Sequence, residues 1–257
     1  MVVSGALQGK TIIVTGAGGG IGKEACMVLA KAGANVVVTD IAEDRGSETA
    51  AAITGAGLSA RFIPADLSSE DQIRSLVAQA VKIFGRLDGA FNNAGVEQCA
   101  LPLHQLTLEQ WERAIRIDLT SVFLCIKHQV TAMLATGGGA IVNTASSLGR
   151  VAIPNASEYV SAKHGVVGLT RAAAAEYGSQ GIRVNAVLPG IVLTPMISRL
   201  VGDPLFQAFF EKVRERHPIG RFGQPQEIGQ AVTWLLSEAA SFVNGADIAV
   251  DGGYLAV

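Results

Sequence analysis

The chain has 257 residues, of which 49% are hydrophobic and 16% are charged, a composition that favours a large buried core over disorder. Its formal net charge of −2 gives no electrostatic footprint for nucleic acid, and no Lys/Arg cluster indicates a membrane-surface segment. No apolar stretch reaches the roughly 18 residues of a membrane-spanning helix, and the first residues do not resemble a signal peptide. We therefore expect a cytoplasmic protein without nucleic acid or membrane partners.

Short β-branched runs alternate with longer, Ala-rich helical stretches along the chain. In chain order we expect a strand at Thr11–Thr15, a helix at Ile21–Lys31, a strand at Asn35–Thr39, a helix at Glu43–Ile53, a strand at Arg61–Ile63, a helix at Ser69–Phe84, a strand at Asp88–Phe91, a helix at Leu108–Ala135, a strand at Ala140–Thr144, a helix at Ser157–Tyr177, a strand at Arg183–Val187, a helix at Pro225–Leu236 and a strand at Ala246–Val250. Continuous apolar strands separated by helices indicate a parallel sheet covered on both faces. Because no Pro- or Ser-rich linker divides the chain, we predict one doubly wound α/β domain over residues 1–257, with about seven strands.

The segment Pro195–Arg216 interrupts this alternation with a concentration of apolar side chains directly after a strand. Ligands of open α/β sheets bind beyond the carboxyl ends of the strands, so the segment is a candidate substrate lid, at about residues 195–216. A helix packed on the body or at a subunit contact explains it equally well.

Cysteine and histidine give no sign of a metal site. Cys26, Cys99 and Cys125 are widely separated and lack metal-ligand spacing, and the four histidines are not paired. Buried thiols in a reducing compartment account for the cysteines better than disulfides.

The first expected strand leads into a glycine-rich turn and then a helix. Glycines permit a tight turn and close approach of phosphates, while the helix N-terminus supplies N–H groups and a partial positive charge. The common G-x-G-x-x-G spacing fails, since after Gly16 and Gly18 it would require glycine at Ile21; G-x-x-x-G-x-G through Gly16, Gly20 and Gly22 is present instead. Between a strand and a helix, this turn predicts a dinucleotide-binding site.

Acidic residues follow the next two strands. Asp40 ends the second strand, where its carboxylate would accept hydrogen bonds from the adenosine ribose and repel a 2′-phosphate, so NAD is predicted over NADP. We assign Ile41, Asp66 and Leu67 to the same end of the cofactor site. Asp40 could instead cap a helix or lie in a solvated loop, and Asp66 equally fits a helix start.

The most informative pattern is Ser146…Tyr159…Lys163. Tyrosine is a poor base at neutral pH, because its ordinary pKa is about 10. Positions i and i+4 share a helix face, so the Lys163 ammonium can lie near the Tyr159 phenol and favour the phenolate. A serine hydroxyl from another segment could bind the same oxygen. Tyr-x-x-x-Lys alone often occurs by chance on amphipathic helices, so the assignment depends on the other motifs.

Taken together, five motifs in order resemble the short-chain dehydrogenase/reductase family over nearly the whole chain. They are Thr15-Gly16…Gly20-Ile21-Gly22, Asn92-Asn93-Ala94-Gly95, Ser146…Tyr159…Lys163, Pro189-Gly190-Ile191-Val192-Leu193-Thr194 and Asp251-Gly252-Gly253. The resemblance implies a Rossmann-type fold and a homotetramer in which Leu108–Ala135 and Ser157–Tyr177 pack between subunits. It also implies that Lys163 holds the ribose hydroxyls, and that the cofactor is bordered further by Asn93, Ala94, Gly95, Pro189, Gly190, Val192 and Thr194.

One position departs from the family pattern. Asp118 stands where the family usually has asparagine, a residue whose backbone carbonyl helps to hold a water linked to the lysine. The resemblance makes Asp118 a member of the proton relay, and its carboxylate near Lys163 would change the pH profile. A helix residue capped by its own neighbours is the alternative.

These motifs predict an NAD-dependent oxidoreductase that interconverts a secondary alcohol and its ketone, with Tyr159 as general base or acid and Ser146 binding the reacting oxygen. Two stretches, Leu87-Asp88-Gly89-Ala90-Phe91-Asn92-Asn93-Ala94 and His217-Pro218-Ile219-Gly220-Arg221-Phe222, resemble the bacterial branch of this family that oxidises cyclic alcohols and dihydrodiols. This resemblance implies a cyclic or bulky apolar substrate. Substrate-site candidates besides Ser146 and Tyr159 are Ser147, Val96, Gln98, Asn155 and Met196. The alternatives are a 3-oxoacyl thioester reductase and a catalytically silent nucleotide sensor.

Overall fold

The computed structural model describes residues 5–195, 197–198 and 207–257 and has a parallel β-sheet at its centre. The sheet order is β3-β2-β1-β4-β5-β6-β7. The strands are β1 (Thr11–Thr15), β2 (Asn35–Thr39), β3 (Ala60–Phe62), β4 (Gly89–Asn92), β5 (Gly139–Thr144), β6 (Ile182–Pro189) and β7 (Asp247–Val250). The doubly wound α/β prediction is confirmed, and every expected strand is present within two residues of its predicted ends.

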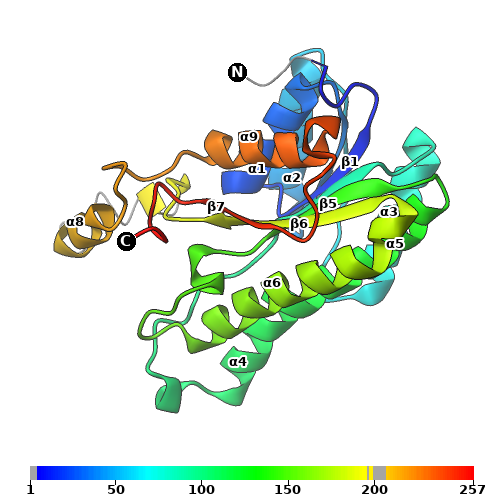
Figure 1. Cartoon of the computed structure of the whole chain (residues 1–257). Coiled ribbons are helices and arrows are strands. Elements are labelled where there is room, and N and C mark those ends of the chain that lie inside the picture. Colours follow the sequence, from blue (N-terminus) through cyan, green and yellow to red (C-terminus); the bar gives the residue numbers. More distant parts are fainter. Residues whose placement is uncertain (1–4, 196, 199–206) are drawn as a thin grey trace.

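Helices cover both faces of the sheet (Figure 1). One face carries α1 (Gly20–Lys31), α2 (Glu43–Gly55) and α9 (Pro225–Leu236), and the other α3 (Glu70–Phe84), α5 (Ser121–Leu134) and α6 (Ser157–Tyr177). The other helical elements whose bounds the structure describes are α4 (Leu108–Ile115), the π-helical turn η2 (Arg116–Thr120), α8 (Gln207–Glu215) and the short 3₁₀ turns η1 (Leu103–Gln105), η3 (Ser147–Gly149), η4 (Gly178–Gln180) and η6 (Glu238–Ala240). Each face has its own buried apolar cluster, because strands covered on both sides are apolar throughout.

Local sequence signals set several helix ends. The Ser69 hydroxyl accepts a hydrogen bond from Gln72 N at the start of α3, and Gly85 ends that helix with φ 83°. Thr107 and Gln110 form a capping box at the start of α4.

The predicted single helix over Leu108–Ala135 is divided. Helix α4 ends at Ile115, η2 follows with π-helical hydrogen bonding, and α5 resumes at Ser121. Such a turn inserts one extra residue and rotates the side chains that follow it, and it is frequent at functional sites. Here it carries Asp118, which is fully buried.

A chain of polar side chains crosses the buried layer between the sheet and the helices α5 and α6. Asn92 Nδ2 on β4 donates to Gln129 Oε1 on α5 (3.1 Å) and to Asn143 Oδ1 on β5 (2.9 Å). Asn143 Nδ2 in turn donates to Thr170 Oγ1 on α6 at 2.9 Å. All four residues are buried.

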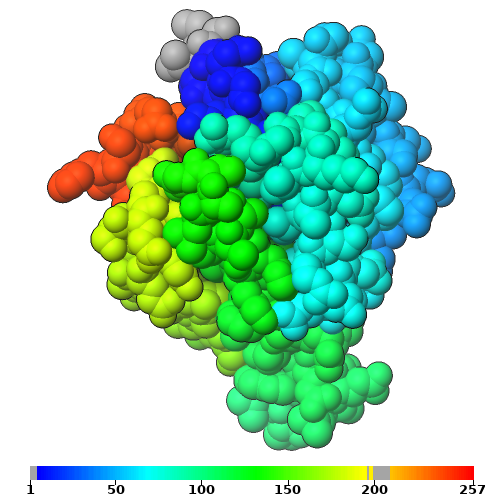
Figure 2. Space-filling view, turned by 90° about the vertical axis from the view of Figure 1, so that its right-hand side faces the viewer, coloured from blue at the N-terminus to red at the C-terminus, as the bar shows by residue number. Residues whose placement is uncertain are grey.

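Helix α4 and the segment before it stand out from the body of the molecule (Figures 1 and 2). Leu103 and Leu108 are each 71% exposed there, and Trp111 is 38% exposed. Part of the predicted lid forms α8, whereas Met196 and residues 199–206 lie outside the described residues. Across the described chain, no helix is both long and apolar enough to cross a membrane.

Candidate active site

The predicted cofactor and catalytic motifs meet at the carboxyl edge of the sheet. The turn after β1 touches the segment after β4, since a Cβ added to Gly16 would lie 2.8 Å from Ala94 Cα. The same turn meets the segment after β6, because a Cβ on Gly20 would lie 3.1 Å from Thr194 Cγ2. This edge is where open parallel sheets bind their ligands.

The glycine turn is held in place by contacts that exclude larger side chains. A Cβ on Gly22 would lie only 2.2 Å from the carbonyl oxygen of Gly16, and Gly16 itself has φ 63°. Thr15 Oγ1 accepts hydrogen bonds from the backbone N–H groups of Asn93 (2.9 Å) and Ala94 (3.0 Å). No side chain caps the N-terminus of α1, so its N–H groups remain free for an anion. The turn therefore fits a pyrophosphate.

Asp40 connects the end of β2 to the glycine turn. Its Oδ2 accepts from Gly18 N at 2.8 Å and its Oδ1 from Ala42 N at 2.9 Å. Next to it, the Ile41 side chain is 70% exposed beside the turn. The Asp40 carboxylate thus lies against the glycine turn, as the predicted cofactor site requires, and both of its oxygens also accept backbone hydrogen bonds.

Asp66 takes part in the turn that leads into α3. Its Oδ1 accepts from Ser68 N at 2.9 Å, which favours the helix-start alternative for its side chain. Leu67 packs in the core, so that only its backbone is available to a ligand.

Tyr159 lies in the first turn of α6 and Lys163 one turn later. The Lys163 ammonium is 5.3 Å from the centre of the Tyr159 ring. It donates to the carbonyl of Thr144 at the end of β5 at 3.1 Å, and Lys163 is only 3% exposed. The helical i, i+4 spacing thus brings the predicted pair together, with the cation held away from bulk water.

Asp118 joins this pair through its carboxylate. Its Oδ1 lies 3.3 Å from Lys163 Nζ and accepts from Val96 N at 3.1 Å. Its Oδ2 is buried without a hydrogen-bond partner. Burial raises the pKa of Asp118, against the opposing effects of the Lys163 charge and the Val96 N–H. The contact of Asp118 with the lysine is therefore made by its side chain.

The two serines after β5 have different surroundings. Ser146 Oγ accepts from Leu148 N at 3.1 Å, which leaves its own proton available to another acceptor. Ser147 Oγ donates to the carbonyl of Pro189 at 3.1 Å and is buried, so it ties this turn to the end of β6. The turn also packs on α6, because a Cβ on Gly149 would lie 3.0 Å from the Lys163 carbonyl oxygen.

The segment after β6 is fixed by His217, a side chain for which the sequence predicted no role of its own. Its Nε2 accepts from Ile191 N at 3.2 Å, while Nδ1 donates to the carbonyl of Val213 on α8 at 2.8 Å. A Cβ on Gly190 would lie 2.8 Å from that Nε2. His217 therefore links α8 to the segment after β6, in which Val192 is buried.

The segment after β4 and the loop before α6 contain most of the remaining substrate candidates. Val96 is half-buried, Gln98 is exposed, and Asn155 has a left-handed backbone with φ 63°. Glu158, for which no sequence motif predicts a role, is fully buried and accepts a hydrogen bond from Cys99 N at 2.6 Å.

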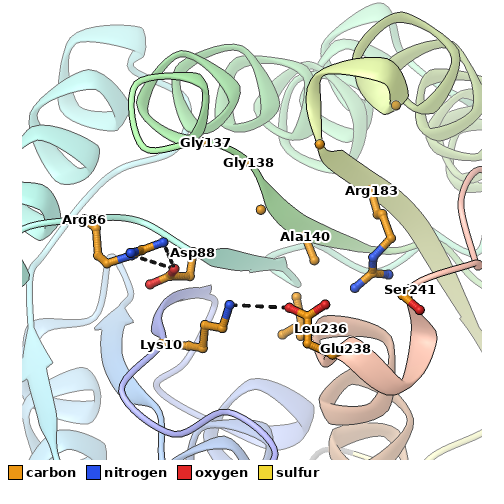
Figure 3. A pocket seen from close by; sticks show the side chains of 13 residues that line it. Lys10, Arg86, Asp88, Gly137, Gly138, Ala140, Arg183, Leu236, Glu238 and Ser241 are labelled. Carbon is orange, nitrogen blue, oxygen red and sulfur yellow. Dashed lines mark hydrogen bonds and ion pairs between the residues drawn. The ribbon is translucent and has the colours of Figure 1, made fainter.

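A cavity of about 350 Å³ lies at the opposite, amino edge of the sheet (Figure 3). Its charged side chains are already partnered: Lys10 with Glu238, Arg86 with Asp88, and Arg183 with the backbone carbonyls of Ser237 and Val243. It contains none of the residues assigned to the reaction. No group of three His, Cys, Asp or Glu side chains that could hold a metal occurs in the described ranges.

Comparison with known proteins agrees with this geometry. The family model described as enoyl-(acyl carrier protein) reductase matches residues 16–255. The chain belongs to the short-chain dehydrogenase/reductase family. Among its relatives is the 2,5-dichloro-2,5-cyclohexadiene-1,4-diol dehydrogenase of Sphingobium indicum, 49% identical over 98% of this chain and 99% of the relative. The cyclohexanol dehydrogenase of an Acinetobacter species is 43% identical over 98% of each chain.

Solved structures of the same family superpose closely. The crystal structure of levodione reductase has a TM-score of 0.93 at 37% identity and covers 98% of this chain and 99% of its own. A protein from Beutenbergia cavernae, provisionally assigned as an NAD(P)-dependent gluconate 5-dehydrogenase, carries NADP at low occupancy. Its TM-score is 0.91 at 36% identity, with 98% of each chain covered.

Proposed function

We propose that this protein is an NAD-dependent dehydrogenase that interconverts a secondary, cyclic or bulky apolar alcohol and its ketone. The observation that carries the proposal is the buried Lys163 ammonium 5.3 Å from the Tyr159 ring, beside a glycine turn fitted to a dinucleotide. When bound, the nicotinamide accepts or returns the hydride.

The residues of the chain handle the proton and the oxygen. In the oxidative direction, Tyr159 phenolate takes the hydroxyl proton of the alcohol, and Ser146 donates a hydrogen bond to the same oxygen. Lys163 favours the phenolate by its charge and binds the ribose hydroxyls, while Asp118 holds the lysine in place. In the reductive direction, Tyr159 returns the proton to the carbonyl oxygen.

The cofactor is proposed to lie along the carboxyl edge of the sheet. Its pyrophosphate contacts the turn at Gly16, Gly18, Gly20, Ile21 and Gly22, its adenosine the residues Asp40, Ile41, Asp66 and Leu67, and its nicotinamide half the residues Asn93, Ala94, Gly95, Pro189, Gly190, Val192 and Thr194. Asp40 supports NAD, since its carboxylate would repel a 2′-phosphate. The NADP in a related structure makes this preference the first property to measure.

Relatives that act on six-membered rings support a cyclic alcohol as substrate. The pocket is proposed to include Ser147, Val96, Gln98, Asn155 and Met196, with α8 as part of a lid. Initial rates of NADH formation with a panel of cyclic secondary alcohols, using NAD⁺ and NADP⁺ in parallel, test substrate and cofactor together. Because the matched family model is described as enoyl-(acyl carrier protein) reductase, a 3-oxoacyl thioester belongs in the same panel.

The tyrosine assignment is tested by Tyr159→Phe. Removing the phenolic oxygen eliminates the proton acceptor but leaves the cofactor site, so turnover should fall by about 10²-fold or more. NADH binding, followed by fluorescence titration, should change little. Turnover retained within a few-fold would exclude Tyr159 as the general base. Cofactor binding by the wild type without turnover of any substrate would instead favour a nucleotide sensor.

The exposed apolar side chains of α4, together with the half-exposed Phe123 of α5, support the proposal of a homotetramer packed through α4, α5 and α6. A single domain and a cytoplasmic location remain part of the same proposal. Light scattering measures the assembly directly.

A further inference from the structure

The segment from Val96 to Ala100 follows β4 directly and is attached at two points to buried carboxylates. Asp118 on η2 accepts from Val96 N at 3.1 Å, and Glu158 on α6 accepts from Cys99 N at 2.6 Å. Both carboxylates are 0% exposed. The two elements that carry Lys163 and the relay position therefore also fix the backbone of this segment.

Glu158 is an acidic residue on the buried face of a helix, where apolar residues are usual. It directly precedes Tyr159 and lies on the buried face of α6, one turn before Ala162. Its Oε1 binds Cys99 N, whereas its Oε2 is buried without a hydrogen-bond partner. A buried carboxylate with an unsatisfied oxygen is destabilising compared with an apolar side chain of similar size. What this residue supplies that methionine or leucine would not is therefore the hydrogen bond to Cys99 N.

The attached segment has a constrained shape. Ala100, the residue after the anchored Cys99, has a left-handed backbone with φ 57°, which a non-glycine residue adopts only when its surroundings impose it. Burial and the neighbouring Glu158 carboxylate both raise the pKa of the Cys99 thiol. Between the anchors, Glu97 and Gln98 are exposed beside the active site.

From these contacts we propose that Glu158 is a positioning residue that holds residues 96–100 as one wall of the substrate site and thereby sets affinity for the alcohol. The proposal rests on the proposed function. Neither Asp118 Oδ2 nor Glu158 Oε2 is accessible, so neither contacts the substrate, and both act through the backbone of the segment. Asp118 also contacts Lys163, whereas Glu158 has no described contact with that lysine. A substitution at Glu158 therefore tests the positioning of the segment without disturbing the contact between Asp118 and Lys163.

The test compares Glu158→Met, which removes the acceptor at similar volume, with Glu158→Gln, which keeps an acceptor oxygen but loses the charge. Glu176→Met and Glu176→Gln, at an exposed position near the other end of α6, are the controls for the same two substitutions on this helix. We expect Glu158→Met to raise KM for the alcohol by about five-fold or more with kcat and NADH affinity nearly unchanged, because only the substrate wall is loosened. Glu158→Gln should restore KM to within about two-fold of the wild type.

Hydrogen exchange of a peptide that covers residues 96–100, measured on the same proteins, supplies a readout that is independent of turnover. Faster exchange in Glu158→Met than in Glu158→Gln supports the anchor, and equal exchange overturns it. If hydrogen exchange is faster in Glu158→Met but KM for the alcohol is unchanged, the segment does not set substrate affinity. A loss of NADH affinity in parallel with the rise in KM would overturn that role as well. If the wild type turned over no alcohol, only the proposed function would be refuted. Hydrogen exchange of residues 96–100 would still show whether Glu158 anchors this segment. If Glu158→Met does not fold, Glu158→Asp, which keeps the charge but shortens the reach, replaces it in both measurements.

Discussion

Replacing Asp118 with asparagine should shift the pH dependence of alcohol oxidation. The amide oxygen of Asp118→Asn can still accept from Val96 N, so the substitution removes the charge and keeps the contact. Oδ1 of Asp118 lies 3.3 Å from Lys163 Nζ, which is 5.3 Å from the Tyr159 ring centre. The carboxylate is thus no more than about 8.6 Å from that ring. At that distance the negative charge of Asp118 opposes the positive charge of Lys163, which favours the phenolate form of Tyr159.

At this distance, one unit charge contributes about 2 kcal/mol at an effective dielectric constant of about 20, and about half as much at 40. Since one pH unit corresponds to about 1.36 kcal/mol, the acid limb of kcat/KM in the oxidative direction should move by roughly 0.7–1.4 units. The sign is downward, because removing the carboxylate leaves the lysine charge uncompensated and the phenolate persists to lower pH.

The assay measures kcat/KM for alcohol oxidation from about pH 6 to pH 10, with the wild type and Asp71→Asn in parallel. Asp71 is an exposed carboxylate paired with Arg74 on α3, and its substitution removes the same charge far from the site. An acid limb that stays in place, or moves upward, would refute the reasoning. It would mean that Asp118 carries a proton over the whole range, in the direction to which its burial already drives its pKa.

Two further predictions concern cofactor binding and acid stability. Gly22→Ala should weaken NADH binding by about ten-fold or more in a fluorescence titration, since its Cβ would lie 2.2 Å from the Gly16 carbonyl oxygen and displace the turn. Gly19→Ala is the control, because an added Cβ there meets nothing within 4 Å, and equal weakening in both would contradict the steric argument. Arg221 holds the pKa of Glu227 at about 2, so this pair stabilises the fold above the ordinary range of a glutamate and loses that contribution as pH falls toward 2. The melting temperature of Arg221→Met should therefore lie below that of the wild type at pH 7, and the difference should shrink below the ordinary range of a glutamate and vanish only as pH approaches 2, whereas a constant difference would contradict the linkage.

Much of the architecture could be predicted because the strands are continuous apolar runs and the catalytic spacing is a helical one. The division of the expected helix Leu108–Ala135 could not be predicted in the same way. Residues on both sides of η2 have ordinary helical composition, and the extra residue is accommodated by tertiary contacts of Asp118 with Val96 and Lys163. Sequence periodicity does not report such contacts, which join segments far apart in the chain.

The roles of Glu158 and His217 were not predicted from the sequence, and only Glu158 carries a sequence signal that could have indicated its role. Glu158 falls on the i, i+4 series with Ala162, Val166 and Thr170, all buried on α6, so a charged residue in that series could have been noticed. His217 gave no such signal, because its importance lies in two backbone groups of Val213 and Ile191 that only the fold brings together.

The buried polar chain from Asn92 through Gln129 and Asn143 to Thr170 has a consequence for how the sheet assembles. Neighbouring β4 and β5 are apolar on both faces, so hydrophobic burial alone would tolerate several alignments. If one of these strands shifted by one residue, its asparagine would turn to the other face, so Asn92 and Asn143 would no longer meet and the amide contact between them would be lost in a buried layer. Misaligned strand pairings thus cost free energy, because they leave buried amide groups unpaired, whereas the native pairing does not. This part of the sheet is therefore selective for one alignment during folding.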